Sequence, residues 1–248
     1  MDEVSLYSPE AKLALCYPVD SRECTRRLSI LEILGVSKLC SLGPVELPGS
    51  RLRVLGKGHA SVVVAGLMDD VIVAIKARRV DGKRESLIEE ARFLEEASRA
   101  GVAPRPIYYD RDLIVMEAVI GPRLEDLLEL ATRETWVVVE ALRASRVLDA
   151  LNILHLELSR PWRNMLYTGD VRGSKALIVD YESARRGCGN VLSLVGGLTR
   201  LPHLGSLARS SSLREYAKTY RVECREDIYK QIENMVAKTL EENLGSPE

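Results

Sequence analysis

The chain has 248 residues, of which 46% are hydrophobic and 29% charged, so it can bury the core of one large domain or of two lobes. The net charge of −1 gives no support for bulk electrostatic attraction to nucleic acid or a membrane and leaves local charged patches open. No apolar stretch approaches about 18 residues and the chain shows no basic leader, so we expect a cytoplasmic protein. The five cysteines are odd in number and form no C-x-x-C pair, which favours free thiols in a reducing compartment over a disulfide framework or a zinc ribbon.

The first 48 residues are expected to form a small N-terminal extension. Apolar residues at helical spacing predict a helix over residues 22–34, and Gly35 is placed to end it. A hairpin is expected around Gly43-Pro44 and Pro48-Gly49. We interpret this segment as packing on the lobe that follows, with a winged-helix DNA-binding module as the alternative.

The next part of the chain has the pattern of a small sheet with one helix. Short β-branched and apolar runs predict strands at residues 62–65, 71–77, 107–109 and 113–116. An apolar stripe with charge elsewhere predicts a helix over residues 84–100, closed by Gly101. The last two strands are expected to pair across a short polar turn.

The remaining residues are expected to be mainly helical. The predicted helices are residues 124–130, 134–152, 213–220 and 227–240. Two short strands, 165–167 and 176–179, flank a glycine-containing turn. The whole pattern predicts an α+β chain in three parts, residues 1–48, 49–118 and 119–248, in which a small sheet lobe and a larger helical lobe frame a cleft.

A glycine turn opens the small lobe, with Gly56 and Gly58 followed by Ser61. Glycine lets backbone N–H groups approach a phosphate without a Cβ clash. A lysine strand, residues 73–76 (VAIK), comes next, which is the order that a nucleotide site needs. For the turn taken alone an ordinary hairpin is the alternative, and no G-x-x-x-x-G-K-[ST] sequence supports a Walker-type site.

Lys76 ends the apolar run of that strand, so we expect its stem to be buried and its ammonium to face the cleft. A buried ammonium needs a counter-charge. The following helix offers Glu90 as the first choice, just before an apolar turn, and Glu89 as the second. The alternative is a surface lysine at the end of a strand.

Two oxygen-bearing side chains of the helical part suit a metal ion. Asp180 follows the apolar residues 176–179, which places a carboxylate at the end of a strand, and Asn164 precedes another short strand. Carboxylate and amide oxygens are ligands for Mg²⁺ beside phosphate. Each residue has a simple turn as its alternative.

The segment between the long helix and Asn164 carries the residues for proton and anion chemistry. Glu157 is the carboxylate best placed to orient or deprotonate an attacking hydroxyl, whereas His155 is interpreted as anchoring the loop. Arg160 and Arg163 are candidates to neutralise phosphate or hold an acidic substrate. The pair at 185–186 either faces substrate or is a solvated pair.

With these motifs in order, the chain resembles the protein-kinase superfamily. Within it, the chain is most similar to small atypical archaeal kinases: the RIO kinases, the KEOPS-associated kinase and a predicted archaeal serine/threonine kinase group. The glycine turn, the VAIK strand, residues 90–94 and the segment 114–124 carry this resemblance, which spans about residues 51–185. It implies a bilobal protein-kinase-like fold with a small antiparallel-sheet N-lobe, a shortened helical C-lobe and a small N-terminal extension.

The resemblance also implies roles for single residues. Lys76 and Glu90 would align the phosphates of ATP, Glu157 would serve the attacking hydroxyl, and Asp180 and Asn164 would hold Mg²⁺. The residues implied to contact the nucleotide are Gly56, Gly58, Ser61, Val62, Ala74, Lys76, Met116, Glu117 and Val119. Met116 takes the gatekeeper position, and the next residues of the connector offer backbone groups to adenine.

The chain departs from the kinase pattern in its catalytic motifs. The H-R-D aspartate becomes Glu157, Asn164 follows it by seven residues instead of five, and D-F-G reads Asp180-Tyr181-Glu182. No A-P-E segment follows. The expected function is an ATP- and Mg²⁺-dependent phosphotransferase, either an atypical serine/threonine protein kinase or a kinase-fold ATPase.

The expected partners are a protein substrate with a serine or threonine hydroxyl, or a component linked to RNA modification or the ribosome. No membrane partner and no metal other than Mg²⁺ or Mn²⁺ are expected. The alternatives for the function are a pseudokinase-like nucleotide-binding regulatory module and a small-molecule kinase.

Overall fold

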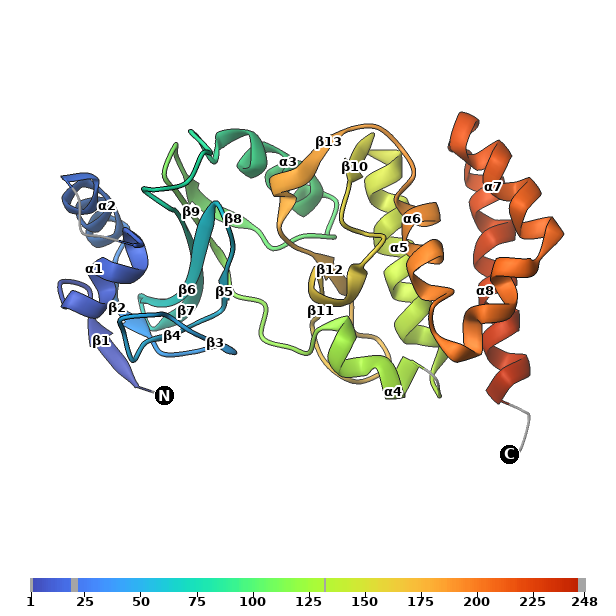
Figure 1. Ribbon diagram of the computed structural model, residues 1–248, viewed down its shortest axis with the longest axis horizontal. Helices are drawn as coiled ribbons and strands as arrows, with labels where there is room; N and C mark the ends of the chain where they lie inside the picture. Colours follow the sequence, from blue (N-terminus) through green and yellow to red (C-terminus); the bar gives the residue numbers. More distant parts are fainter. Residues whose placement is uncertain (1, 19–21, 132, 245–248) are drawn as a thin grey trace. The chain divides into compact units, whose positions relative to one another are not determined.

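A computed structural model describes residues 2–18, 22–131 and 133–244 (Figure 1). They form an α+β structure that divides into two compact units. The first unit contains residues 1–92 and 105–118, and the second contains residues 93–104 and 119–248. Residues 1–48 thus belong to the same compact unit as the residues that follow them, and the chain passes between units within helix α3 (Ile88–Arg99).

A fully antiparallel sheet forms the centre of the first unit, in the order β1-β2-β6-β7-β9-β8 with β5 paired to β6. Its strands are β1 (Glu3–Ser5), β2 (Val36–Cys40), β5 (Gly56–Lys57), β6 (Ser61–Met68), β7 (Val71–Arg78), β8 (Pro106–Tyr109) and β9 (Leu113–Glu117). The four strands predicted for this part are confirmed as β6 to β9. Their β-branched residues suit a pleated surface that is buried by neighbours.

The N-terminal residues build onto this sheet. Helices α1 (Pro9–Leu15) and α2 (Arg22–Ile33) lie against it, and Leu28 and Leu31 share one apolar core with Val62 and Ile75 (Figure 1). The helix predicted over 22–34 is therefore confirmed, as is a hairpin near Pro48, formed by β3 (Val45–Glu46) and β4 (Arg53–Val54). Because β1 and β2 extend the main sheet, the segment has a different arrangement from the separate winged-helix module considered as the alternative.

The second unit is mainly helical. After η1 (Leu124–Leu127), its helices are α4 (Leu128–Ala131), α5 (Thr135–Ala150), α6 (Asn190–Leu198), η4 (Pro202–Arg209), α7 (Ser211–Glu223) and α8 (Glu226–Leu244). Two small antiparallel ladders carry its loops: β10 (Ile153–His155) with β13 (Ala184–Arg186), and β11 (Met165–Tyr167) with β12 (Ala176–Ile178). Short turns η2 (Pro161–Arg163) and η3 (Tyr181–Ser183) complete it. Helix α5 packs against α6 and α8, and α7 packs against α8.

Several elements differ from the sequence expectation. Helix α3 begins at Ile88 instead of residue 84, because the Ser86 hydroxyl accepts a hydrogen bond from Ile88 N at 3.2 Å and Arg111 Nε donates to Glu85 O at 2.8 Å. Strands β10 and β13 and helix α6 were not predicted. The partner of β10 or β13 lies about 30 residues away along the chain, so no local turn indicates their pairing, whereas a single short turn joins β11 and β12, which were predicted.

The structure corrects the prediction of free thiols. Cys16 is bonded to Cys24, and Cys188 to Cys224, while Cys40 is a buried free cysteine. Their Cα atoms are 5.7 and 6.5 Å apart, within the range that a disulfide requires. The expectation of a reducing compartment rested on unpaired thiols and loses that basis. Cysteine spacing was uninformative because helix packing, not sequence proximity, brings Cys188 to Cys224.

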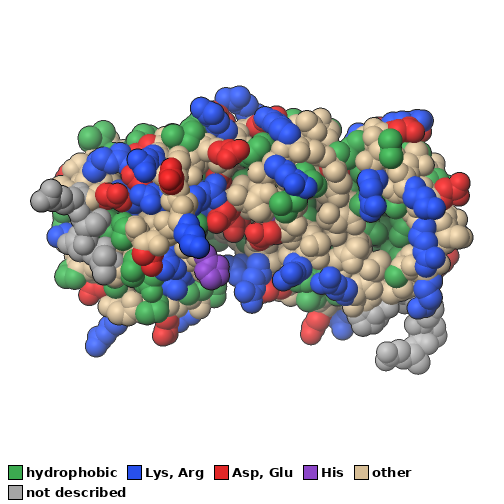
Figure 2. Space-filling model, turned by 45° about the horizontal axis from the view of Figure 1, so that its top comes forward, with side chains coloured by type: hydrophobic (Ala, Val, Ile, Leu, Met, Phe, Trp, Pro, Cys, Tyr) green, Lys and Arg blue, Asp and Glu red, His purple; other side chains and the backbone are tan. Residues whose placement is uncertain are grey.

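Charged side chains of both signs are interspersed over the face drawn in Figure 2, as the net charge of −1 leads one to expect. Among the described residues, no helix combines the length and the apolar character needed to cross a membrane. Exposed large apolar side chains are scattered, and they include Ile33 and Val222, each 84% exposed. Singly exposed apolar residues are ordinary on protein surfaces.

Candidate functional site

The glycine turn lies between β5 and β6 in the first unit. Gly56 pairs with Val63, and Gly58 N donates to Ser61 O at 2.9 Å, which closes the turn. Neither Gly56 nor Gly58 has a left-handed φ. A Cβ at Gly56 would meet no described atom within 4 Å, and one at Gly58 only Ser61 O at 3.8 Å. Packing within the unit therefore does not require glycine here, which leaves the approach of a ligand as a physical reason for both glycines.

Lys76 and Glu90 form a buried ion pair. Lys76 lies on β7, the strand that pairs with β6, and β6 follows the glycine turn. Strand β7 lies between β6 and β9, and the Lys76 side chain pairs with Glu90 of α3 at 2.5 Å. Lys76 is 4% exposed and Glu90 is 3% exposed, whereas Glu89 is exposed. Arg84 Nη1 lies 3.6 Å from the second oxygen of Glu90. Glu90 is thus the partner of Lys76, and Glu89, the second choice from sequence, is not.

Of the residues predicted to contact adenine, Ala74, Met116 and Glu117 lie where β7 and β9 pair, whereas Val119 lies beyond β9 and belongs to the second unit. Ala74 is opposite Met116 and Val73 is opposite Glu117. The backbone N–H of Glu117 already donates to Arg105 O at 2.9 Å, and its carboxylate accepts from Arg105 Nε at 2.8 Å. The Glu117 N–H is therefore occupied, which removes it from the backbone groups that the resemblance offered to adenine.

His155 is a buried anchor of the loop that carries Glu157 in the second unit. Its Nε2 lies 3.1 Å from Val179 O, its Nδ1 lies 3.4 Å from Glu157 N, and its ring stands edge-on to Tyr181. These partners fit the neutral ring with hydrogen on Nε2, a tautomer inferred from the contacts. Burial lowers the pKa of His155, which keeps the ring neutral. The anchoring role expected from sequence agrees with this geometry.

Glu157 and Asn164 are brought together by the same loop. Asn164 Nδ2 donates to Glu157 Oε2 at 2.8 Å. Asn164 is buried, while Glu157 is exposed. Since the amide nitrogen faces the glutamate, the amide oxygen is the Asn164 atom suited to a cation.

Asp180 lies two residues beyond the end of β12, which pairs with β11, the strand that Asn164 immediately precedes. Val179 N donates to Asn164 O at 3.0 Å, so the next residue, Asp180, begins beside the Asn164 backbone. Asp180 is exposed and has φ 66° and ψ 65°, the left-handed region. A non-glycine residue there costs about 1–2 kcal/mol, and such strain is concentrated at functional sites. The structure therefore places Glu157, Asn164 and Asp180 in one neighbourhood of the second unit.

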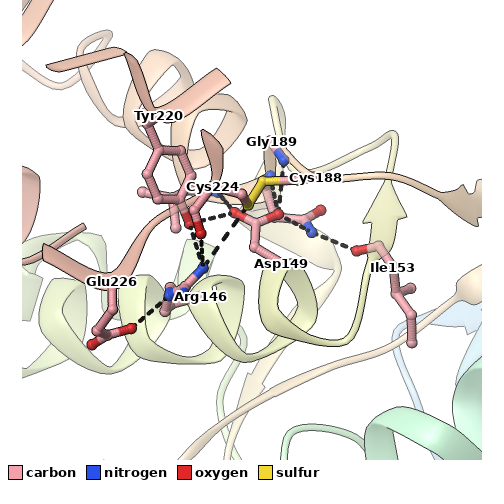
Figure 3. Close-up of a disulfide and its surroundings, with 10 residues drawn as sticks. Arg146, Asp149, Ile153, Cys188, Gly189, Tyr220, Cys224 and Glu226 are labelled. Atoms are coloured by element: carbon pink, nitrogen blue, oxygen red, sulfur yellow. Dashed lines mark hydrogen bonds and ion pairs between the residues drawn. A yellow bond between two sulfur atoms is a disulfide. The ribbon is translucent and has the colours of Figure 1, made fainter. Parts of the chain in front are cut away.

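Sequence reasoning missed the residues that hold this loop, Asn190 and Asp149. Asn190 Oδ1 accepts from His155 N at 2.8 Å, and its Nδ2 donates to Ile153 O at 2.6 Å. Asp149 of α5 accepts five hydrogen bonds, from Gly189 N, Asn190 N, Asn190 Nδ2, Val191 N and Tyr220 Oη (Figure 3). The one sequence clue was a carboxylate within the apolar residues 147–150.

The arginines near the loop divide into two kinds. Arg186 pairs with Glu96 at 2.8 Å and covers Phe93, and Arg163 lies 3.5 Å from Glu125. Arg160 and Arg185 are exposed and make no ion pair with any residue that the structure describes. Arg186 is thus a structural residue, and of the pair at 185–186 only Arg185 stays a candidate for substrate contact.

One further group of side chains has the composition of a metal site. The ligand atoms of Asp149, Cys188 and Cys224 lie within 4.8 Å of one another. Both sulfurs are committed to the disulfide, however, and the five hydrogen bonds to Asp149 use the roughly four lone-pair positions of a carboxylate. This cluster is therefore a hydrogen-bonded anchor.

The candidate residues thus form two sets, Lys76 with Glu90 beside the glycine turn in the first unit, and Glu157, Asn164 and Asp180 in the second. No protein-family model matches the sequence, and the comparison with curated proteins gave no match.

Proposed function

We propose that the chain is an ATP- and Mg²⁺-dependent phosphotransferase with a protein-kinase-like fold, of the atypical serine/threonine protein kinase type or a kinase-fold ATPase. The observation that carries this proposal is the buried Lys76–Glu90 pair next to a glycine turn whose glycines the packing does not need. A buried ion pair is a poor device for stability, because desolvation offsets its attraction. The presence of the Lys76–Glu90 pair is explained if Glu90 positions the Lys76 ammonium to bind a polyanion.

The second unit supplies the residues that fit a magnesium ion. Asp180 offers a carboxylate on a strained, exposed residue, and Asn164 offers an amide oxygen whose nitrogen is already used by Glu157. Hard oxygen ligands of this kind are those that Mg²⁺ prefers, and the ion would neutralise phosphate charge. Glu157, which is exposed and oriented by Asn164, would accept the proton of a serine or threonine hydroxyl.

The test is transfer of labelled γ-phosphate from Mg-ATP to the chain itself or to a generic acceptor protein, together with ATP hydrolysis. Asp180→Asn tolerates the left-handed backbone and is expected to lower turnover at least about a hundredfold. Glu157→Gln should lower turnover by a similar factor and leave ATP binding intact. Asp170→Asn, an exposed aspartate of the β11–β12 turn, is the matched control.

Wild-type protein that neither binds nor turns over Mg-ATP would overturn the proposal. Turnover that is unchanged in Asp180→Asn would overturn the assignment of the metal ligand.

A pseudokinase-like nucleotide-binding module is the second candidate, and a specific observation favours it. Tyr181, in the place of a kinase phenylalanine, is fully buried against His155, and its hydroxyl has no hydrogen-bond partner among the described residues. Glycine does not follow it, so the Asp180 segment lacks the usual hinge. Thermal stabilisation by ATP without any γ-phosphate turnover would support this module over the enzyme.

A further inference from the structure

Tyr17 of the N-terminal residues lies against two cations that belong to the glycine-turn region. The Nζ atom of Lys57 and the guanidinium carbon of Arg79 are each 5.0 Å from the centroid of the Tyr17 ring. Lys57 is in β5, at the start of the turn, and Arg79 follows the end of β7. A cation within about 6 Å of an aromatic ring is attracted to its face.

Arg79 is also hydrogen-bonded to the glycine turn. Its Nη1 donates to Gly58 O at 3.0 Å, and its backbone N donates to Ala60 O at 2.8 Å. Asp81 accepts two further bonds from the guanidinium, at 2.9 and 2.7 Å. The Arg79 guanidinium therefore holds the glycine turn from one side. The Tyr17 ring and Asp81 in turn hold the guanidinium in place.

Tyr17 is itself held in place by the fold. Its carbonyl accepts from Val80 N at 3.1 Å, and the residue before it, Cys16, is fully buried and bonded to Cys24 of α2. The fully buried Arg27 of α2 donates to Leu15 O and to Arg78 O, at 2.5 and 2.7 Å. The N-terminal helices are thus tied to the end of β7, two residues beyond Lys76.

We propose that Tyr17 is a positioning residue that orders the glycine turn for nucleotide phosphates by holding Lys57 and Arg79. The value of this contact to phosphate binding rests on the proposed function, whereas the ordering of the turn does not. Ordering a loop before binding removes an entropic cost from the binding step. The N-terminal residues would then act on ATP affinity without touching the nucleotide.

The experiment compares Tyr17→Leu, which removes the ring, with Tyr17→Phe, which keeps it. Amide hydrogen exchange at Gly58, measured without nucleotide, should be about fivefold faster in Tyr17→Leu and unchanged in Tyr17→Phe. The KM for ATP should rise about fivefold in Tyr17→Leu with kcat changed by less than about twofold, and Tyr17→Phe should restore it.

Equal exchange at Gly58 in wild type and Tyr17→Leu would overturn the proposal, as would a Tyr17→Phe variant as fast as Tyr17→Leu. If Tyr17→Leu does not fold, Lys57→Gln, at an exposed residue, serves instead, and its Gly58 exchange must rise about twofold. A chain that binds no ATP would refute the proposed function, but the exchange result would still decide whether Tyr17 orders the turn.

Discussion

The two sets of candidate residues, the lysine set (Lys76 with Glu90) in the first unit and the carboxylate set (Glu157, Asn164 and Asp180) in the second, are held in place by different means. Lys76 lies in a central strand with a hydrogen-bonded neighbour on each side, so the backbone ladder fixes it. Glu157 and Asp180 lie in loops next to three-residue strands, and a few buried polar side chains fix those loops. We therefore expect Lys76 to keep its position when a single side chain outside the sheet is removed. The loops of Glu157 and Asp180, in contrast, should depend on each of the polar side chains that hold them.

The largest expected effect therefore falls on the carboxylate set. Asp149→Ala removes the acceptor of three backbone N–H groups and of the Tyr220 hydroxyl, and one of the two acceptors of the Asn190 amide, in a largely buried place. We expect the free energy of unfolding to fall by about 4 kcal/mol. Asp170→Ala, at an exposed turn, should change it by less than about 0.5 kcal/mol. Urea denaturation of both variants measures the change in the free energy of unfolding. A change as small for Asp149→Ala as for Asp170→Ala would contradict the expectation that polar side chains hold the carboxylate set.

The next prediction concerns the lysine set. Lys76→Met removes the ion-pair partner at 2.5 Å from the buried Glu90 carboxylate, while Arg84 lies 3.6 Å from its second oxygen, and should lower the free energy of unfolding by about 3 kcal/mol. Adding Glu90→Leu should recover most of this loss, because no uncompensated charge then remains, while the proposed phosphate transfer would stay lost.

The exposed pair of Arg99 with Glu95, 2.7 Å apart, is the matched control, since breaking it should cost less than about 0.5 kcal/mol. Denaturant unfolding curves of the single and double variants give the coupling free energy between Lys76 and Glu90. A double variant as unstable as Lys76→Met would contradict the expectation.

The smallest expected effect is a pH dependence from His155. Burial lowers the pKa of His155 in the folded protein, while the unfolded chain takes up the proton near the ordinary value of about 6.5. Its contribution to stability is thus complete above about pH 6.5 and is lost as the pH falls from there toward the folded pKa, by at most about 1.4 kcal/mol per pH unit.

Melting temperatures between pH 8 and pH 5 measure this loss. His155→Gln should show a weaker dependence, whereas His59→Gln, at an exposed residue, should retain that of the wild type. Identical pH profiles for all three proteins would refute the role of His155.

Local pattern was sufficient for the long elements of the chain. Strands β6 and β7 have eight residues each and are rich in β-branched side chains, and α3 has a continuous apolar stripe. Such regularities depend on residues close in sequence, so they can be read without the fold. For the same reason the sequence assigns Lys76 to a strand and Glu90 to a helix, just before an apolar turn, and the structure pairs the two at 2.5 Å.

Tertiary structure alone decided what holds the loops and the N-terminal residues. Asp149 and Asn190 are 41 residues apart, Cys188 and Cys224 are 36 apart, and Tyr17 meets Lys57 and Arg79 from a distant segment. Each of these residues has an ordinary local sequence, because its partner is supplied by packing and not by a neighbour along the chain. The amino-acid sequence by itself specified the longer strands and helices and the residue types of the candidate site, because these depend on neighbours along the chain, whereas burial and long-range pairing selected which side chains became anchors.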